Sequence, residues 1–187
     1  MIAGPNGSGK TTTANLVIPN YPSIYEFINA DEIAKGLAPR HPESVSLTAS
    51  KLMINRMKEL LEAHQNIAFE TTGSGTNYVK HLKKAQMEGY KVYLMFLWLS
   101  SPELAVQRVR QRVSQGGHHI PEETIIRRYY LGLKNLFAYY LPLVDNAVIL
   151  DNSVGVHKII AKKNKMSGLK IEKPNLWEEM ERVAYDK

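Results

Sequence analysis

The segment from Gly4 to Thr11 carries the residues whose types and spacing indicate chemistry most clearly. It reads Gly-Pro-Asn-Gly-Ser-Gly-Lys-Thr and fits the pattern G-x-x-x-x-G-K-[ST] at every fixed position. In this pattern the glycines let the backbone wrap a phosphate chain with its N–H groups pointing inward. The helix expected to follow would turn the positive end of its dipole toward the same phosphates. We therefore predict a P-loop that binds ATP together with Mg²⁺.

The predicted nucleotide site includes the whole loop and the residue after it. Lys10 is the cation expected to reach the β- and γ-phosphates, and the hydroxyl of Thr11 is the expected ligand of Mg²⁺. Because P-loops occur in kinases, GTPases, ABC ATPases and motor proteins, the motif alone does not identify the reaction. The complete set of predicted nucleotide-binding residues is Gly4, Pro5, Asn6, Gly7, Ser8, Gly9, Lys10, Thr11 and Thr12.

Two acids stand at the ends of predicted strands. Asp31 follows Asn29 and Ala30, and Glu70 ends an apolar run in front of a polar loop that begins at Thr71. Ligands approach an open parallel sheet at the carboxyl ends of its strands, so both acids could face the phosphate site. Each acid also has a structural interpretation. Asp31 could cap a helix, and Glu70 could be a solvated acid beside a surface turn.

Arginines cluster in the segment from about residue 101 to residue 128. Arg108 and Arg112 lie four residues apart on a predicted helix, where like charges repel unless an anion lies between them. The pair Gly116–Gly117 could form a hinge, and Arg127–Arg128 follow on the next helix. This arrangement is typical of a mobile lid that brings arginines to a transferring phosphoryl group. The alternative is a solvated basic pair of helices.

The order of apolar and amphipathic segments predicts the elements that position these residues. Their alternation is typical of a parallel sheet covered by helices. We predict a helix start at Ser101-Pro102-Glu103, because it combines a capping serine, a proline and an acid. The predicted strands are Met1–Ala3, Glu26–Asn29, Ile67–Glu70, Lys91–Leu99 and Ala147–Leu150. The predicted helices begin near Gly9, Glu43, Asn77, Pro102 and Pro121, and the last one is expected to pack through Ile126, Tyr130, Leu133, Phe137 and Tyr140.

Length and composition limit the class of protein. The chain has 187 residues, of which 44% are hydrophobic and 22% charged, values typical of one folded domain. It contains no cysteine, so disulfides, thiol catalysis and cysteine-based zinc sites are excluded. The beginning of the sequence lacks the features of a secretory signal, and no apolar run reaches the ~20 residues needed to cross a bilayer. We expect a cytoplasmic protein without a membrane partner.

The net charge of +6 is concentrated near the end of the chain. Six lysines and one glutamate lie between Lys158 and Lys173, which gives this stretch a net charge of +5. The lysines are not interleaved with aromatic residues, so we predict a solvated surface and do not expect nucleic-acid binding. The adjacent His118 and His119 have no further ligands near them in the sequence, and no metal site is expected there.

Several of these segments, taken in order, resemble one known family. They are Gly4 to Thr12, Asn29 to Ala34, Phe69 to Thr72, Gly116 to His118 with Arg127 to Tyr129, and Asp151 to Ser153. Together they resemble the zeta-toxin-type P-loop kinases, the group that contains UDP-N-acetylglucosamine kinases. The resemblance covers about residues 1–153 and implies an α/β, three-layer P-loop kinase fold with a mostly parallel central sheet, flanking helices and an arginine-bearing lid. Residues 154–187 would then be a basic extension packed on this domain.

The resemblance also implies roles for individual residues. Asp31 would be the base that accepts the proton of the acceptor hydroxyl, and Lys10, Thr11, Arg112 and Arg128 would contact phosphate and metal. Glu70 and Thr71 would lie on the substrate side.

The expected activity is ATP-dependent transfer of the γ-phosphoryl group to a hydroxyl, for which a nucleotide sugar such as UDP-N-acetylglucosamine is suspected. An antitoxin-like protein is a candidate partner, although no antitoxin segment is visible. Two alternatives stay open: a nucleotide-binding regulatory or toxin–antitoxin module with little turnover, and a polynucleotide-end kinase. An ABC-type ATPase is disfavoured because the sequence has no Leu-Ser-Gly-Gly-Gln signature.

Overall fold

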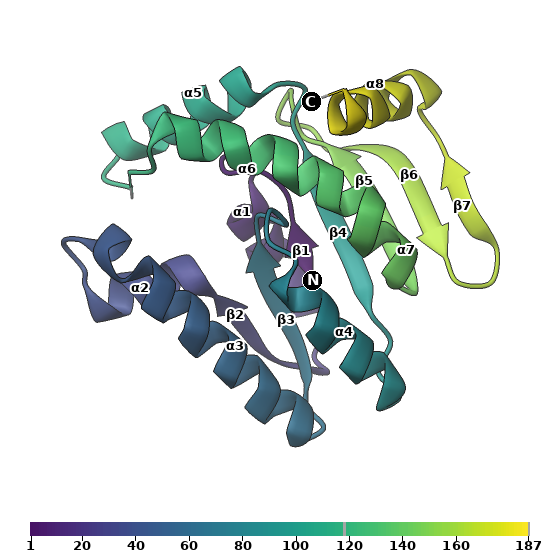
Figure 1. Cartoon of the computed structure of the whole chain (residues 1–187), viewed down its shortest axis with the longest axis horizontal. Coiled ribbons are helices and arrows are strands. Elements are labelled where there is room, and N and C mark those ends of the chain that lie inside the picture. The colour runs from purple at the N-terminus through teal and green to yellow at the C-terminus, as the bar shows by residue number, and fades with distance from the viewer. Residues whose placement is uncertain (118, 187) are drawn as a thin grey trace.

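A seven-stranded sheet with the strand order β2-β3-β1-β4-β5-β6-β7 forms the centre of the protein (Figure 1). The computed structural model describes residues 1–117 and 119–186. The first five strands of this order are parallel, and β6 and β7 are antiparallel to their neighbours. The strands are β1 (Ile2–Ala3), β2 (Ile24–Asn29), β3 (Asn66–Thr71), β4 (Tyr93–Trp98), β5 (Asn146–Asp151), β6 (Lys158–Asn164) and β7 (Gly168–Ile171). The predicted mostly parallel α/β fold is therefore confirmed.

Helices α1 to α7 lie in the connections between the parallel strands, and α8 follows β7. They are α1 (Lys10–Val17), α2 (Ala30–Leu37), α3 (Ser46–Glu62), α4 (Asn77–Met87), α5 (Pro102–Ser114), α6 (Glu122–Asn135), α7 (Leu141–Leu143) and α8 (Pro174–Tyr185), with short 3₁₀ turns at 18–20 and 42–45. The predicted start of α5 is confirmed, since Ser101 Oγ accepts the N–H of Leu104 at 3.2 Å and Pro102 is the first helical residue. No helix in the described part of the chain is both long and apolar enough to span a bilayer.

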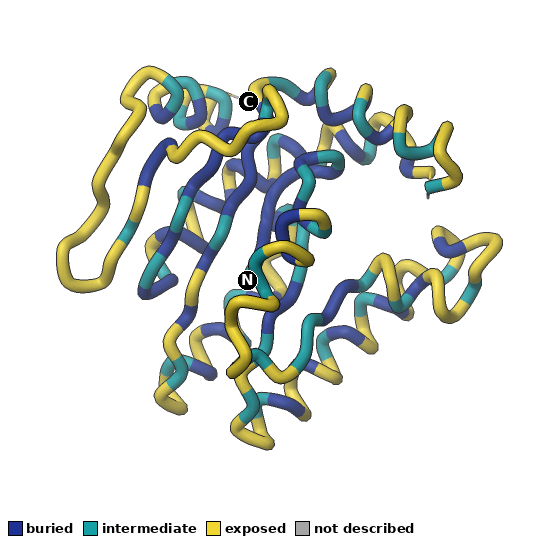
Figure 2. The backbone as a smooth tube through the Cα atoms, turned by 180° about the vertical axis from the view of Figure 1, so that it is seen from behind, coloured by how far each residue is buried: buried dark blue, intermediate teal, exposed yellow. Residues whose placement is uncertain are grey.

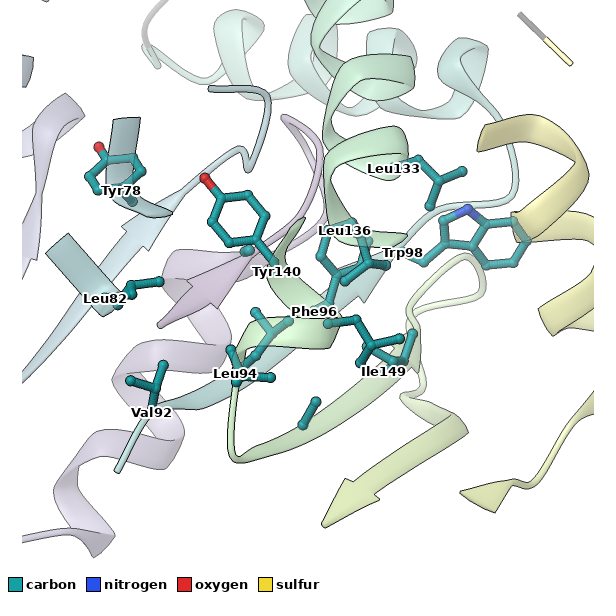
Figure 3. Packing of buried hydrophobic residues seen from close by; sticks show 14 of the residues in the cluster. Tyr78, Leu82, Val92, Leu94, Phe96, Trp98, Leu133, Leu136, Tyr140 and Ile149 are labelled. Atoms are coloured by element: carbon teal, nitrogen blue, oxygen red, sulfur yellow. The ribbon is translucent and has the colours of Figure 1, made fainter. Parts of the chain in front are cut away.

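The helices cover the sheet from two sides. The larger core packs α3, α4, α6 and α8 against one face through side chains such as Phe96, Trp98 and Ile149 (Figure 3). On the opposite face, Ala14 of α1 packs against Ile2 and Leu97. The central strands are accordingly buried along most of their length, whereas the β6–β7 hairpin is mostly exposed (Figure 2).

The elements that were not predicted from the sequence are α2, the three-residue α7, β6, β7 and α8. The lysines between 158 and 173 are mostly exposed, as expected. Lys158, Lys162 and Lys163 lie on β6 and Lys170 on β7, while Lys165 is in the turn between these strands and Lys173 precedes α8. The simple alternation of a strand is absent because the pairing of β5 and β6 shifts register between Ile149 and Leu150, and the adjacent Ile160 and Ala161 are both buried. Helix α8 could have been predicted from the sequence, because Pro174 is its first residue and its buried side chains have helical spacing. These buried residues are Trp177, Met180 and Ala184.

The buried face of α6 differs from the predicted one by one residue. Ile125 and Tyr129 are buried, while the predicted Ile126 is exposed. Leu133 and Tyr140 are buried as predicted. The observed face follows Ile125, Tyr129 and Leu133 at a spacing of four residues, so it meets the predicted face at Leu133. The π-helical turn over residues 136–140 begins only after that point.

A cavity of about 910 Å³ lies at the opposite end of the sheet from the P-loop. Its lining includes residues at or near the amino ends of strands, among them Met1, Ile24, Tyr93 and Asn146. None of the predicted site residues lines it. This cavity is therefore separate from the site that the sequence indicates.

Candidate active site

The P-loop connects the end of β1 to the start of α1, and its path requires glycine at position 4. Gly4 has a φ of +144°, and a Cβ there would lie 2.2 Å from the carbonyl oxygen of Leu97 on β4. Asn6 and Ser8 are buried within the loop. At the end of the loop, Gly9 precedes α1, so no side chain caps this helix, and the first helical turn contains no acidic residue. The amino end of α1 is thus suited to an anionic ligand.

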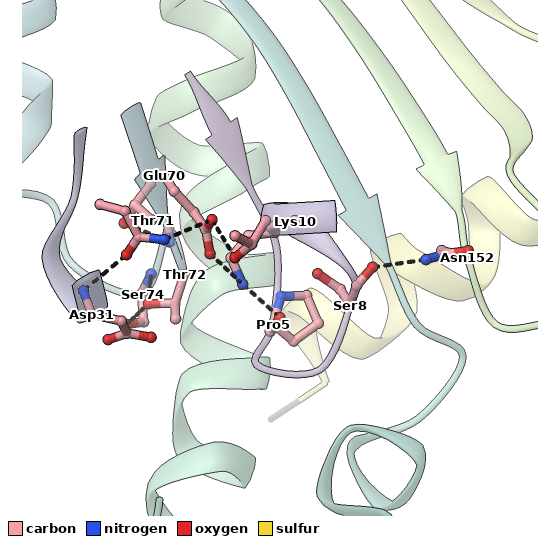
Figure 4. Close-up of polar contacts among 12 residues, drawn as sticks. Pro5, Ser8, Lys10, Asp31, Glu70, Thr71, Thr72, Ser74 and Asn152 are labelled. Carbon is pink, nitrogen blue, oxygen red and sulfur yellow. Dashed lines mark hydrogen bonds and ion pairs between the residues drawn. The ribbon is translucent and has the colours of Figure 1, made fainter. Parts of the chain in front are cut away.

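Lys10 is buried at the centre of a group of charged side chains. Its Nζ donates to the carbonyl oxygen of Pro5 at 2.9 Å and lies 3.7 Å from Oε1 of Glu70 (Figure 4). Burial lowers the pKa of Lys10, and the negative charges of Glu70 and Asp31 oppose that change. Two nearby guanidinium groups, those of Arg112 and Arg128, lower the pKa of Lys10 further. The fold thus brings together all five residues that the sequence indicated as charged participants.

The Glu70 carboxylate contacts the end of the P-loop directly, through Lys10 and Thr11. Its Oε2 accepts the hydroxyl of Thr11 at 2.8 Å and the side-chain amide of Asn29 at 3.1 Å. Mg²⁺ prefers oxygen ligands and is commonly held by one or two side-chain oxygens together with phosphates and water. The Thr11 hydroxyl and the Glu70 carboxylate fit that requirement. Within residues 1–117 and 119–186, no group of three or more His, Asp or Glu side chains could hold a metal by itself.

Asp31 is not the cap of α2. The cap is Asn29, whose side-chain oxygen accepts the backbone N–H of Asp31 at 2.8 Å. The Asp31 side chain is exposed. Burial lowers the pKa of both Lys10 and Arg128, and the negative charge of Asp31 opposes that change in each. The structural interpretation of Asp31 that the sequence left open is therefore wrong, and its carboxylate is available for another role.

The arginines of α5 and α6 differ in their positions. Arg108 is half-buried and donates to the carbonyl oxygens of Gly7 and Ser153. Arg112 and Arg128 are half-buried and close enough to Lys10 to change its pKa, and burial lowers the pKa of Arg128 itself. Arg110 and Arg127 are exposed, and Arg110 Nη2 lies 2.6 Å from a carboxylate oxygen of Glu122. The Gly116–Gly117 pair ends α5, since the N–H groups of both glycines bond to carbonyls of the last helical turn. Of the adjacent histidines, His118 lies outside the described residues.

The loop after β3 is held by its own side chains and by α6. The hydroxyl of Thr71 accepts the N–H of Gly73 at 3.1 Å, and the hydroxyls of Thr72 and Ser74 are 2.8 Å apart. The buried Asn135 of α6 donates to the carbonyl of Gly73 at 3.0 Å. Thr71 therefore shapes the loop next to Glu70. Thr12, the last residue of the predicted nucleotide-binding set, is exposed on α1.

Two asparagines at the site were not assigned roles from the sequence. Asn29 both caps α2 and donates to Glu70, and Asn152 donates from Nδ2 to the carbonyl oxygen of Ser8 at 2.9 Å. Both stand at the carboxyl end of a strand, which is the signal that drew attention to Asp31 and Glu70. A search of those strand ends for amides as well as acids would have found them.

The sheet order, the P-loop after β1 and the arginine-bearing helices after β4 define a P-loop fold of the kinase type. A family model described as zeta toxin matches residues 1–156. The chain therefore belongs to the zeta toxin family, which confirms the resemblance seen in the sequence.

Individual relatives agree with this assignment. A protein of Haemophilus influenzae, named only "Uncharacterized protein", is 29% identical over 126 residues, which cover 67% of this chain and 88% of that protein. A chain of the AvrRxo1-ORF1:ORF2 complex, solved with ATP, has a TM-score of 0.71 at 17% identity and covers 96% of this chain. This chain spans 62% of the length of that one.

A chain of the PezAT toxin–antitoxin system of Streptococcus pneumoniae has a TM-score of 0.65 at 14% identity, covering 100% of this chain and 78% of that chain. At these identities the two solved structures support the fold alone.

Proposed function

We propose that the protein is an ATP-dependent kinase that transfers the γ-phosphoryl group of ATP to a hydroxyl of a small molecule. A nucleotide sugar such as UDP-N-acetylglucosamine is the first candidate for the acceptor, on the basis of the family. The observation that carries the proposal is the convergence of Lys10, Asp31, Arg112 and Arg128 at the amino end of α1, with Glu70 beside them. Phosphoryl transfer requires mainly positioning and neutralisation of charge, and this set provides both.

Each residue has a role that follows from its place. The N–H groups of the P-loop and Lys10 bind the β- and γ-phosphates, and Arg112 and Arg128 neutralise the charge that develops on the transferred group. Thr11 and Glu70 are the side chains that would hold Mg²⁺, which supplies further neutralisation of the phosphate oxygens when bound. Thr71 and Glu70 border the place of the acceptor. An antitoxin-like protein is the partner proposed from the family.

Asp31 accepts the proton of the attacking hydroxyl in this mechanism. The hydroxyl oxygen forms a bond to the γ-phosphorus, the bond from that phosphorus to the β–γ bridging oxygen breaks, and ADP leaves. The proton moves from the hydroxyl to a carboxylate oxygen of Asp31. The exposed position of this carboxylate beside Lys10 and Arg128 supports the role, because an acceptor can approach it from solvent.

The variant Asp31→Asn tests the assignment. We expect phosphate transfer to fall by ~10²–10⁴-fold, the usual contribution of a positioned base, while ATP still binds. Thermal stability should not change, because the α2 cap is made by the side chain of Asn29 and only the backbone of Asp31. Glu32→Gln is a matched control, since Glu32 is the next residue, is exposed and pairs with Lys35.

The measurement is transfer of labelled phosphate from ATP under single-turnover conditions, after a screen of nucleotide sugars, nucleosides and oligonucleotides as acceptors. Transfer to a nucleotide sugar is the expected result. Transfer only to oligonucleotides would establish the polynucleotide-end kinase instead, and binding of ATP without any transfer would favour the regulatory module. A wild-type rate in Asp31→Asn would remove Asp31 from the mechanism and leave Glu70 as the next base.

A further inference from the structure

The turn after β5, residues 151–153, contacts the outer side of the P-loop. The side chain of Asn152 is buried there, and its Nδ2 donates to the carbonyl oxygen of Ser8 at 2.9 Å. Figure 4 shows Asn152 on one side of the loop, while Lys10, Glu70 and Asp31 gather on the other. The contact joins residues that are 144 positions apart in the sequence.

This turn is itself held from several directions. The backbone N–H of Asn152 donates to the carbonyl of Trp98 at 3.0 Å. Asp151 accepts both the N–H and the hydroxyl of Ser153, and the N–H of Ser100 donates to the same hydroxyl. Arg108 of α5 donates from Nη2 to the carbonyl of Ser153 at 2.9 Å and reaches the carbonyl of Gly7 with Nη1 at 3.5 Å. Asn152 therefore approaches the P-loop from a fixed support.

The direction of the Ser8 carbonyl determines the direction of the next N–H group. In a planar trans peptide the carbonyl oxygen and the N–H hydrogen point to opposite sides. When Asn152 holds the Ser8 oxygen on the outer side, the N–H of Gly9 points to the inner side, where the phosphates bind. The fit is close, since a Cβ at Gly9 would lie 2.8 Å from Nδ2 of Asn152.

We propose that Asn152 is a positioning residue for phosphate binding, which orients the Ser8–Gly9 peptide so that the Gly9 N–H donates to the β- or γ-phosphate. The inference rests on the proposed function, because it concerns the same nucleotide site. It adds a residue to that site that does not touch the nucleotide and acts through the backbone of the loop.

The substitution Asn152→Leu tests the proposal, because leucine has nearly the same size but no donor. We expect ATP and inorganic tripolyphosphate to bind about 10- to 100-fold more weakly, the range for one hydrogen bond to a charged group. Calorimetry measures both the dissociation constant and the number of sites. A positioning role raises the dissociation constant at an unchanged number of sites, whereas a merely structural role lowers the number of competent sites. Asn152→Ser, which is smaller, is the second variant.

Asn135→Leu is the matched control, since Asn135 is equally buried and its amide also donates to a loop carbonyl, that of Gly73. It should lose stability but keep wild-type affinity for tripolyphosphate. Equal affinity in wild type and both Asn152 variants would overturn the proposal, as would a reduced number of sites at unchanged affinity or failure of both variants to fold.

The wild-type protein separates this inference from the proposed function. If it binds ATP and tripolyphosphate but transfers phosphate to no acceptor, the proposed kinase activity fails and the role of Asn152 is still tested by affinity. If the wild type binds neither ligand, both are overturned.

Discussion

The charged groups around Lys10 come from residues that are distant from it in the sequence. Asp31 and Glu70 lie at the ends of β2 and β3, and Arg112 and Arg128 come from α5 and α6. Lys10 is thus one of three cations around a single site, and a triphosphate would relieve the repulsion between them. We expect the two arginines to matter most when negative charge builds up on the transferring phosphoryl group.

Arg112→Ala and Arg128→Ala should each lower kcat by ~10³-fold if the guanidinium groups neutralise the charge of the transferring phosphoryl group. Ground-state affinity for ATP should change far less, because an interaction made mainly in the transition state contributes little to binding. Steady-state kinetics and calorimetry measure the two quantities. Arg110→Ala and Arg127→Ala are the controls, since both side chains are exposed on the same helices. Wild-type turnover in both test variants would show that α5 and α6 form only a solvated basic surface.

At the scale of elements, the close approach of α6 to the loop after β3 depends on Gly132. A Cβ at Gly132 would lie 2.7 Å from the carbonyl oxygen of Thr72. This oxygen belongs to the backbone and, unlike the end of a flexible side chain, cannot rotate away. The same contact region includes the bond from Asn135 to Gly73. The helix that carries Arg128 is therefore placed against the loop that follows Glu70.

Gly132→Ala should lower the free energy of unfolding by about 1–3 kcal/mol, the usual cost of forcing extra volume into a packed contact.

Gly36→Ala is expected to have the opposite effect on stability. Gly36 lies within α2, and a Cβ added there would meet no atom within 4 Å, so alanine should raise stability by up to about 1 kcal/mol through helix propensity. Urea unfolding of the two variants measures both effects. A neutral Gly132→Ala would show that α6 can move away without cost.

At the scale of the whole molecule, Asp145 links four elements at the end of the sheet opposite the P-loop. Its Oδ2 accepts the N–H of Val92 at 2.8 Å and the side-chain amide of Gln86 at 3.0 Å, and its Oδ1 lies 2.7 Å from Nζ of Lys165. The bond from Lys165, followed by those from Val92 and Gln86, holds the pKa of this carboxyl well below its usual value of 3.8. The β6–β7 hairpin is thereby tied to β4, β5 and α4.

Asp145→Asn should lower the free energy of unfolding at pH 7 by about 1–3 kcal/mol, because it weakens a set of hydrogen bonds to a charged group. A carboxyl whose pKa is depressed in the folded state stabilises the fold above its unfolded pKa, and this contribution is lost as pH falls below it. The difference between wild type and variant should therefore shrink below about pH 4. Glu88→Gln, at an exposed pair with Lys84, is the control and should change little. A difference that persists unchanged at pH 3 would contradict the role of the charge.

The parts of the fold predicted from the sequence are those with local signals. The P-loop pattern, the Ser101-Pro102 helix start and the buried runs of the five parallel strands lie within short windows of sequence. The β6–β7 hairpin was missed because its register shift depends on the partner strand β5. The sequence offered Asp31 as a possible helix cap and the structure has Asn29 instead, because Asn and Asp are comparable caps and only the backbone geometry selects one of them.

For the candidate site, the sequence by itself determined the chemistry: a loop that can wrap phosphates, a lysine and a hydroxyl at fixed spacing, two acids at strand ends and several arginines. The tertiary structure decided which of these groups meet. It brought Glu70 to Thr11 and Lys10, separated Arg112 and Arg128 from the exposed Arg110 and Arg127, and placed Asn152 against the P-loop. The physical reason is that residue types and helix or strand periods are local properties of a chain. Contacts between groups 59 or 144 residues apart depend instead on strand order and on how helices pack across the sheet.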